Sequence, residues 1–461
     1  MKKIQIKMPE DAKKIISLLN NAGFEAYAVG GAVRDSLLSM KDSFQDLEPK
    51  DWDISTNAKP EDVHKVFKEY KIIDTGLKHG TVTVIMNGQP YEVTTFRRDG
   101  KYTDGRRPDN VYFTNSLAED LSRRDITINA MAYHPKKGLI DPFGGKSDLE
   151  KGIIKCVGYS HDRLREDALR ILRVLRFSAQ LGFSIDKNTQ EALVVNKHLL
   201  KAVSAERILN ELKKMLVAKN FLSVFANIKI LPVIFYILPE LEPTLDFEQH
   251  NPYHTKDVYG HTIEATNYAN PTFVQRMTLL LHDIAKPQCF SLDKNNVGHF
   301  YKHPEESAAI ANNILLRLKT DTKSRELIVT LIQNHDIEFV PKQRFVNKML
   351  NKFGEETFRE LIAVKKADIL AQSHKFLIER LNNLLEIEDM VTKTINSGQC
   401  FSLKDLNING VDIMSLGITQ GEIVGETLRY LLTNVIEEKL ENDKGVLKTE
   451  AKKFLEQRRV V

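Results

Sequence analysis

The spacing of hydrophobic and polar residues changes near Asp162. Before that point, short segments that are rich in β-branched residues or alternate in polarity predict strands at AYAVGG, DWDIST, GTVTVIMN and YEVTTFR. An amphipathic helix is predicted ahead of them over PEDAKKIISLLNNAG, with Gly23 as its stop. The Asn87-Gly88 pair between the last two strands predicts a tight hairpin. The first third of the chain is therefore expected to be mixed α/β.

From Asp162 onward the hydrophobic pattern is helical. REDALRILRVLRFSAQL and SAERILNELKKMLVA place apolar residues three and four positions apart, and Pro and Gly become rare except at the expected boundaries. Boundaries near 151, 239–243 and 397–401 predict four segments, 1–150, 151–240, 241–400 and 401–461. We therefore expect an α+β multidomain protein, with a mixed-sheet head followed by a helical neck, body and tail.

Composition adds limits on location and partners. The chain is 42% hydrophobic and 28% charged, as is ordinary for globular proteins. No apolar run approaches the roughly 20 residues of a membrane span, and the N-terminal segment lacks the apolar core of a signal peptide. Cys156, Cys289 and Cys400 lack disulfide-like or metal-like spacing, which favours a reducing cytoplasm. A net charge of +4 neither requires nor excludes a nucleic-acid partner.

Two motifs in the first third carry candidate phosphate chemistry. GGAVRD, from Gly30 to Asp35, lies between a predicted strand and a predicted helix, where backbone N–H groups can approach a phosphate and Arg34 can add a charged hydrogen bond. In DWDIST, Asp51 and Asp53 share one face of a predicted strand, and divalent cations would relieve their repulsion. Glu92 is a candidate third carboxylate. Each feature alone also has a structural interpretation: a turn, a solvated strand face or an edge glutamate.

The order of these motifs resembles the DNA polymerase β-like nucleotidyltransferases. More specifically, the chain is similar to the bacterial class II tRNA nucleotidyltransferases, the CCA-adding enzymes. The motifs that carry the resemblance occur in the family's order: GGAVRD, DWDIST, TGLKHGTVTV, EVTTFRRDGKYTDGRRPD, LAEDLSRRDITINAMA, IDPFGG and REDALRILRVLRF. It is close over the first half and looser afterwards. SMKDSFQDLEPK, between Asp35 and Asp51, is longer than the family's connection, and we expect a surface loop there.

The resemblance implies an activity and its participants. It implies template-independent addition of C, C and A to the 3′ end of tRNA from CTP and ATP, with pyrophosphate released. It implies Mg²⁺ at Asp51 and Asp53, with Glu92 as a further catalytic carboxylate. Implied nucleotide contacts in the head are Gly30, Gly31, Arg34 and Arg124. RRDGKYTDGRRPD, a complete flexible loop, implies use of ATP as well as CTP. An A-adding enzyme and a poly(A) polymerase remain the alternatives, although TGLKHGTVTV lacks the basic signature of poly(A) polymerases.

REDALRILRVLRF also suggests how the base is chosen. Asp167 and Arg170 are expected as i, i+3 neighbours on one helix. Cytosine and adenine both present a ring-nitrogen acceptor beside an amino donor, so one Arg donor and one Asp acceptor can satisfy either base. Uracil and guanine present the reverse pattern and would leave these groups unpaired. The resemblance assigns this task to Asp167 and Arg170, assisted by Arg173 and Arg176. A weak ion pair on a solvated helix face is the alternative.

The second half contains a spaced series of histidines. His261, the His282-Asp283 doublet and Asp368 resemble, in their order, the metal ligands of HD-superfamily phosphohydrolases. His303 and His335 resemble the additional ligands of two-metal versions. Imidazole and carboxylate ligands suit a divalent transition metal and a hydrolytic water. A degenerate module that serves as a tRNA-binding scaffold is the alternative. Four other histidines are expected to be structural or at the surface: His64, His134, His254 and His299.

Two further functional classes remain open at this point. The chain could be a non-catalytic RNA-binding protein that keeps the fold, or an enzyme whose main activity is hydrolysis at the HD-like site. Lys213, Lys214 and the basic residues near Lys452 are candidate contacts to tRNA phosphates. We expect tRNA to be recognised mainly through its shape and backbone, because one tail is added to many tRNA sequences. The sequence predicts no membrane partner and leaves the oligomeric state open.

Overall fold

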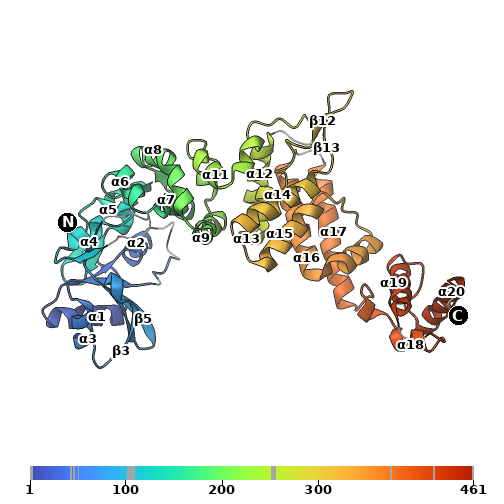
Figure 1. Cartoon of the computed structure of the whole chain (residues 1–461), viewed down its shortest axis with the longest axis horizontal. Coiled ribbons are helices and arrows are strands. Elements are labelled where there is room, and N and C mark those ends of the chain that lie inside the picture. Colours follow the sequence, from blue (N-terminus) through green and yellow to red (C-terminus); the bar gives the residue numbers. More distant parts are fainter. Residues whose placement is uncertain are drawn as a thin grey trace. The chain divides into compact units, whose positions relative to one another are not determined.

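The computed structural model describes residues 4–41, 44, 47–49, 51–100, 110–250, 256–373, 376–418 and 421–458. The chain forms two compact units (Figure 1). The first contains Met1–Pro239 with Arg317–Lys319, and the second contains Glu240–Leu316 with Thr320–Val461. A mixed sheet with helices in the head, followed by helical segments, confirms the predicted α+β class. The finer division into four segments stays a prediction.

A seven-stranded sheet forms the centre of the head, in the order β3-β4-β5-β2-β1-β8-β9. Within these strands β2 and β5 pair in parallel, and the other neighbours are antiparallel. The strands are β1 (Ala26–Val29), β2 (Asp53–Thr56), β3 (Lys71–Gly76), β4 (Thr81–Met86), β5 (Gln89–Thr95), β8 (Ala132–His134) and β9 (Gly138–Ile140). The four strands predicted from the sequence are therefore confirmed as β1, β2, β4 and β5.

The predicted hairpin is also confirmed. Met86 pairs with Gln89, so Asn87 and Gly88 alone connect β4 to β5. Their φ angles are 48° and 79°, the left-handed values that a two-residue turn requires and that Asn-Gly adopts easily. This turn fixes the register of β5 and therefore the position of Glu92.

Helices of the first unit surround the sheet and continue into the neck. In the head they are α1 (Glu10–Asn21), α2 (Gly31–Leu38), α3 (Pro60–Val66), α4 (Leu117–Ser122) and α5 (Gly145–Lys151). In the neck they are α6 (Ser160–Glu166), α7 (Leu169–Leu181), α8 (Lys187–Asn196), α9 (Ala205–Leu216), α10 (Leu222–Phe225) and α11 (Leu231–Ile237). Two small pairs complete the unit: β6 (Arg97–Asp99) with β7 (Val111–Phe113), and β10 (Ile153–Ile154) with β11 (Ser184–Ile185).

The prediction that Asp167 and Arg170 share one helix is wrong. α6 ends at Glu166, and Asp167 is extended, with φ −139° and ψ 107°. The Asp167 carboxylate accepts a hydrogen bond from the backbone N–H of Leu169, where α7 begins, at 3.0 Å. The first backbone N–H groups of a helix have no acceptor within the helix. The Asp167 carboxylate caps one of them. The helical spacing of apolar residues continues across the break and hides it in the sequence.

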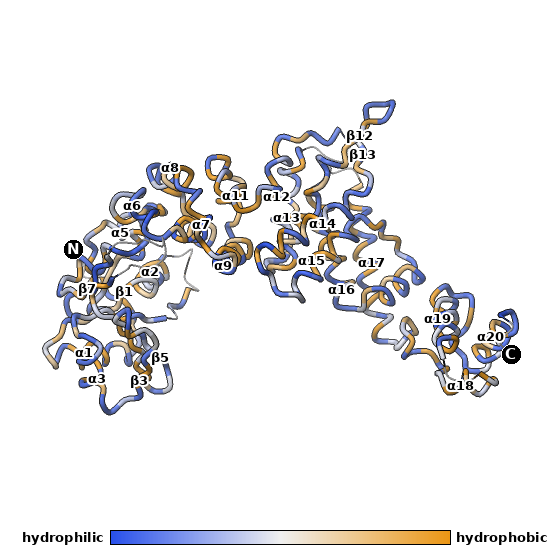
Figure 2. The backbone as a smooth tube through the Cα atoms, in the orientation of Figure 1, coloured by the Kyte–Doolittle hydropathy of each residue, from blue (hydrophilic) through white to orange (hydrophobic). Residues whose placement is uncertain are grey.

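The second unit is helical apart from one small hairpin. Its helices are α12 (Val258–Tyr268), α13 (Phe273–Leu281), α14 (His303–Arg317), α15 (Thr322–Asn334), α16 (Gln343–Ala371), α17 (Leu377–Asn396), α18 (Gly410–Met414), α19 (Glu422–Ile436) and α20 (Lys444–Gln457). β12 (Phe290–Leu292) pairs with β13 (Gly298–Phe300). Apolar and polar segments alternate along these helices (Figure 2), as expected of amphipathic helices.

Apolar cores stabilise the second unit, and two of them can be distinguished among its described residues. One gathers buried residues of α12, α13, α15, α16 and α17, and the other gathers residues of α18, α19 and α20. α16 contains a kink at Gly354, where φ is 73°. None of the helices in the described residues combines the length and apolar character needed to cross a membrane.

Candidate functional sites

A cleft of about 720 Å³ in the first unit brings most of the predicted head residues together. Its walls come from the start of α2, the approach to β2, the segment after α4, and α7. The predicted residues among its lining are Gly30, Gly31, Arg34, Asp51, Asp53, Arg124, Asp167, Arg170, Arg173 and Arg176. Glu92 is not among the described residues that line the cleft. The cleft has the size of a small-molecule site, and among the described residues its lining holds eight cationic and six anionic side chains.

The two aspartates of DWDIST lie on the same side of the backbone. Trp52 between them is buried, with 5% of its surface exposed, so the alternation of the chain directs Asp51 and Asp53 to the cleft. Burial raises the pKa of Asp53 to about 6; Arg124 acts in the opposite direction, and Glu92 and Asp51 raise it further. Glu92 is on β5, one residue before the Ile54–Val93 pair, so it lies beside Asp53. Three carboxylates whose charged forms disfavour one another fit an oxygen-ligated cation such as Mg²⁺.

The glycine turn makes room for an arginine. Gly30 has φ 75° and ψ −133°, and a Cβ at this position would lie 2.7 Å from Nη1 of Arg124. Arg124 is buried, which lowers its pKa, although Asp120 opposes that effect. Arg34 donates from Nε and Nη2 to Asp35 and from Nη1 to Asn129 Oδ1, at 2.8, 3.0 and 2.6 Å. Both guanidinium groups are thus held next to the N-terminus of α2, where an anion is favoured.

The arginines of α7 are each held by an acidic partner. Arg173 donates from Nε and Nη2 to Asp125 Oδ2 at 2.8 and 2.6 Å. Although burial alone would raise it, Arg173 holds the pKa of Asp125 well below its usual range. Arg176 lies 3.3 Å from Glu211 and stacks over Phe177, 4.3 Å from the ring centre.

Arg170 and Asp167 are fixed by different neighbours. Arg170 donates to Glu166 at 2.5 Å and to the backbone carbonyls of Arg163 and Arg123 at 3.0 Å. The second oxygen of Asp167 lies 3.5 Å from Nη2 of Arg207 on α9. Both residues nevertheless line the cleft, and their side chains are oriented before any ligand binds.

Several cleft residues were not predicted from the sequence. Asp125, Asn129, Phe177 and Arg207 line the cleft. Asp125 follows Arg124 directly in the SRRD motif, a local signal that could have identified it, whereas Arg207 reaches the cleft only through the packing of α9 on α7. Leu47 and Glu48, from the segment that was expected to form a surface loop, also line the cleft, and Glu48 is exposed. Lys214 is present in the lining, and residues 101–109 of the predicted flexible loop lie outside the described residues.

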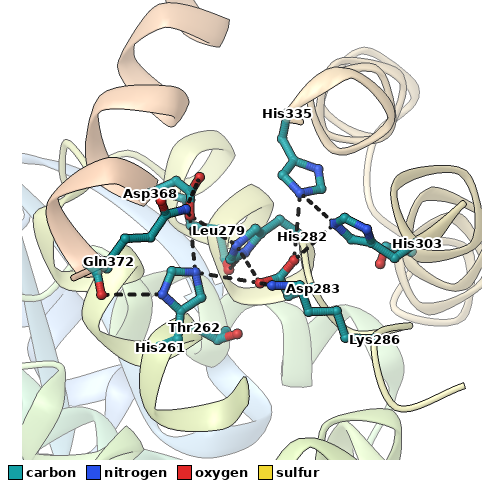
Figure 3. A network of polar contacts seen from close by, with 12 residues as sticks. His261, Thr262, Leu279, His282, Asp283, Lys286, His303, His335, Asp368 and Gln372 are labelled. Carbon is teal, nitrogen blue, oxygen red and sulfur yellow. Dashed lines mark hydrogen bonds and ion pairs between the residues drawn. The ribbon is translucent and has the colours of Figure 1, made fainter. Parts of the chain in front are cut away.

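A second, buried cluster lies in the second unit and contains all six predicted metal ligands (Figure 3). Helix ends and helix faces supply the side chains: His261 from α12, His282 and Asp283 after α13, His303 from α14, His335 after α15, and Asp368 from α16. Asp283 is at the centre. Its Oδ2 lies 3.1 Å from His282 Nε2 and 3.5 Å from His261 Nε2, and its Oδ1 lies 3.4 Å from His303 Nε2 and 3.6 Å from His335 Nε2.

The imidazole rings have the orientation that metal ligands need. Nδ1 of each ring faces a backbone carbonyl: His261 that of Ala371, His282 that of Leu279, His303 that of Phe300, and His335 that of Ile332. A ring that donates from Nδ1 presents the lone pair of Nε2 to the centre of the cluster. Two groups of three possible ligands result, and they share Asp283. The geometry suits two divalent cations bridged by one carboxylate.

The cluster concentrates buried ionisable groups, and some of their polar atoms lack hydrogen bonds to other described residues. Burial alone would lower the pKa of His282, but Asp283 and Asp368 raise it to about 10. Asp283 has a pKa well below its usual range because His282 and Lys286 oppose the effect of burial. Among the described residues, neither His282 Nε2 nor Asp283 Oδ1 has a hydrogen bond of normal geometry. Buried polar atoms of this kind fit a site built for a cation.

Of the four histidines expected to be structural or at the surface, the three within the described residues are not members of the cluster. His134 Nδ1 accepts hydrogen bonds from the backbone N–H groups of Lys136 and Lys137, which is a structural role. His64 forms an exposed pair with Asp74, and His299 pairs with Asp293. His254 lies outside the described residues.

Comparisons with known proteins identify relatives along the whole chain. The family model described as poly A polymerase head domain matches residues 26–155, the RNA and SrmB-binding site of polymerase A matches 182–245, and tRNA nucleotidyltransferase domain 2 matches 301–451. A CCA-adding enzyme from Ligilactobacillus salivarius is 32% identical over 98% of this chain and 98% of its own length. One from Leuconostoc mesenteroides is 33% identical over 96% of each chain.

Solved structures give the same relationship. The crystal structure of the Bacillus stearothermophilus CCA-adding enzyme in complex with CTP superposes with a TM-score of 0.66 and 26% identity, covering 98% of this chain and 99% of that one. The Thermotoga maritima CCA-adding enzyme complexed with tRNA has a TM-score of 0.60 at 21% identity and supports the fold alone.

Replacement of Gly30 tests the geometry of the turn. Both Gly30→Ala and Gly23→Ala place a side chain at positive φ, so each should lower the free energy of unfolding by about 1–2 kcal/mol. The Gly30 variant should also displace Arg124 and weaken CTP binding roughly ten- to a hundredfold, the cost of one charged hydrogen bond. A Cβ at Gly23 has no neighbour within 4 Å, so that variant should bind CTP normally. Calorimetric titration and denaturant unfolding measure both effects; equal CTP affinities in the two variants would contradict the assignment.

Proposed function

Because this chain belongs to the CCA-adding enzyme family, we propose that it adds C, C and A to the 3′ end of tRNA from CTP and ATP, releasing pyrophosphate. The observation that supports this proposal most directly is the cleft, where Asp51 and Asp53, just before and at the start of β2, are lined up with several arginines. This arrangement suits a nucleoside triphosphate and the cations that accompany it. The family relationship over the whole chain favours CCA addition over A-only addition or poly(A) synthesis. We also propose that the enzyme acts in the cytoplasm, because tRNA is its substrate.

We propose that Asp51, Asp53 and Glu92 form the catalytic centre. Mg²⁺ held by Asp51 and Asp53 would activate the attacking hydroxyl and steady the leaving pyrophosphate. The tRNA 3′-hydroxyl attacks the α-phosphorus of the nucleotide, and no covalent enzyme intermediate is needed. The raised pKa of Asp53 supports this assignment, since a carboxylate that is costly to ionise alone gains most from a cation beside it.

We assign the triphosphate to the turn at Gly30 and Gly31. Arg34 and Arg124 lie beside the start of α2, so backbone N–H groups and two guanidinium groups can contact the same anion. Asn129 and Asp35 hold Arg34 in place, which reduces the loss of side-chain freedom on binding. Lys214 on α9 is a further candidate phosphate contact at the cleft wall.

We assign base selection to Asp167 and Arg170, with Arg173 and Arg176 assisting. Glu166 and two backbone carbonyls fix the guanidinium of Arg170, and Leu169 and Arg207 fix the carboxylate of Asp167. A donor and an acceptor with fixed orientations discriminate between bases more strongly than mobile ones. Fixed side chains cannot reorient to form hydrogen bonds with a mismatched base. The same pair can therefore accept C and A while rejecting U and G.

We propose a second activity for the cluster around Asp283, metal-dependent hydrolysis of phosphate esters. The supporting observation is that all four imidazoles present Nε2 to Asp283, and that those of His261 and His282 also face Asp368, as ligands of divalent cations would. His261, His282, Asp283 and Asp368 would hold one cation, and Asp283, His303 and His335 the second. Transition-metal cations bound there would supply a hydroxide for attack on phosphorus. A tRNA-binding scaffold without metal is the rival.

Removal of either aspartate tests the catalytic centre. Asp51→Ala and Asp53→Ala should abolish nucleotide addition and leave the fold and tRNA binding largely unchanged, because the pair holds cations rather than a core. Asp74→Ala is the matched control in the same sheet, with its carboxylate exposed and paired with His64. Incorporation of labelled CTP measures addition, and a filter-binding assay measures tRNA affinity. Near-normal turnover in either cleft variant would exclude this metal site.

Exchange of donors and acceptors tests base selection. Asp167→Ala and Arg170→Ala should each depress CTP and ATP use by roughly ten- to a hundredfold, since each lost charged hydrogen bond costs about 1.5–3 kcal/mol. Asp167→Asn combined with Arg170→Glu should favour UTP and GTP, whose edges carry the reversed pattern. The measurement is kcat/KM for all four nucleotides on tRNA that ends at successive positions. If both single variants still reject UTP and GTP normally, the base is read elsewhere.

A double variant separates the two activities. His282→Ala with Asp283→Ala should lose bound Mn²⁺, Ni²⁺ or Co²⁺ and any hydrolysis of 2′,3′-cyclic nucleotides, while CCA addition continues. His64→Ala with Asp74→Ala removes an exposed His–Asp pair and should retain both properties. Elemental analysis of the purified protein gives the metal content independently of activity. Wild-type protein that binds none of these metals and hydrolyses nothing would favour the scaffold.

A further inference from the structure

The buried cluster borders one cavity of the second unit, and a second cavity lies next to the first. One, of about 370 Å³, is lined by four members of the cluster, Asp283, His303, His335 and Asp368. The other, of about 610 Å³, is lined by residues of α16 and α17 and by the segment after α15. Asp336 and Gln372 line both cavities. A substrate whose phosphorus lies at the cluster has space in the smaller cavity, and past Asp336 and Gln372 it can extend toward the larger one.

The smaller cavity offers an aromatic face and cationic groups. Tyr301 and His299 are stacked, with ring centres 5.4 Å apart and planes 7° apart, and Tyr301 is 70% exposed. Asp293 holds the His299 ring at 3.2 Å, so the stack has a fixed base. Lys286, which is buried and lies 2.7 Å from Asp283, lines the same cavity together with Lys302. An exposed ring in the same cavity as two lysines suits a nucleobase and its phosphate.

The larger cavity also offers aromatic surface. Its charged lining residues are Lys365 and Arg380 together with Asp336, Glu338 and Glu379. Phe339 and Phe376 contribute aromatic surface, and Phe376 is 53% exposed. Arg380 lines this cavity and donates to Gln372 Oε1 at 2.6 Å, while Gln372 donates to both oxygens of Asp368 at 3.0 Å. This chain of hydrogen bonds links the cavity directly to a proposed metal ligand, and Gln372 is visible beside Asp368 in Figure 3. A group bound in the larger cavity therefore lies next to the reacting centre.

We propose that the cluster hydrolyses a linear phosphodiester that carries a nucleoside on each side of the phosphorus. The proposal rests on the metal-dependent hydrolysis assigned to the cluster and specifies its substrate. Water adds to phosphorus, one P–O bond breaks, and the products are a nucleotide with a terminal phosphate and a nucleoside with a free hydroxyl that takes up the proton. One nucleoside stacks on Tyr301, and the other occupies the cavity at Phe376.

Two-sided binding distinguishes this substrate from the simpler ones. A phosphomonoester carries a group on one side of the phosphorus and fills one cavity. A 2′,3′-cyclic nucleotide carries both ester oxygens on one sugar, so it also fills one cavity. A linear dinucleotide makes contacts in both cavities. These contacts should raise its kcat/KM above that of the mononucleotides.

The experiment compares three probes on the metal-loaded full-length protein: 3′,5′-linked adenylyl-adenosine, 3′-AMP and 2′,3′-cyclic AMP, each with Mn²⁺. We expect kcat/KM for the dinucleotide to exceed that for either mononucleotide by about tenfold or more, the worth of one additional stacked base. Tyr301→Ala and Phe376→Ala should each lower the dinucleotide value by roughly tenfold. Because 3′-AMP fills only one cavity, only one of the two variants should lower kcat/KM for 3′-AMP. Tyr301→Trp should restore dinucleotide turnover.

Tyr268→Ala is the matched control, because Tyr268 is 47% exposed on α12 and lies outside both cavities. Thermal unfolding checks that each variant is folded. Mononucleotides hydrolysed as well as the dinucleotide, with both alanine variants sparing the dinucleotide, would overturn the two-sided substrate while hydrolysis itself stands. No turnover of any probe by the metal-loaded protein would overturn the hydrolase and, with it, this inference.

Discussion

The ion pair between Asp125 and Arg173 is the contact on which the nucleotide cleft depends. Asp125 follows α4 in the head and Arg173 belongs to α7 in the neck, so the pair joins two walls of the same cleft. The carboxylate is 7% exposed, and its other oxygen accepts from Asn129, which also orients Arg34. Removal of either partner of a buried pair leaves an uncompensated charge, which is far more costly than the loss of a surface pair. Through Asn129, the position of the Arg34 guanidinium also depends on this contact.

Both proposed sites concentrate charge, but they differ in what balances it. In the cleft, Asp53 has a raised pKa because burial and neighbouring carboxylates outweigh Arg124. In the second unit, Asp283 and Asp368 have lowered pKa values because imidazoles, and Lys286 for Asp283, surround them. The first arrangement favours hard cations that arrive with a triphosphate. The second favours resident transition-metal cations, since nitrogen ligands are already oriented around them.

Features that depend on local sequence could be predicted, and features that depend on packing could not. β1, β2, β4, β5 and the Asn87-Gly88 turn follow from alternation and turn chemistry, which act over a few residues. The break at Asp167 was missed because apolar residues keep helical spacing on both sides of it. Arg207 and Glu48 gave no signal, since they reach the cleft only through tertiary contacts. The order of the histidines suggested a metal site, but their common orientation toward Asp283 depends on five helices packing together.

The two proposed reactions make opposite demands on water, and this explains why one chain would hold two separate centres. Nucleotide addition needs the tRNA hydroxyl, not water, to reach the α-phosphorus, so a cleft that is filled by the base, the triphosphate and the tRNA end protects the reaction. Hydrolysis needs water beside the cation, and its cluster borders a cavity that can admit it. A single centre could not satisfy both demands. Separate ligand sets, carboxylates in the head and imidazoles in the second unit, allow each reaction to keep its own nucleophile.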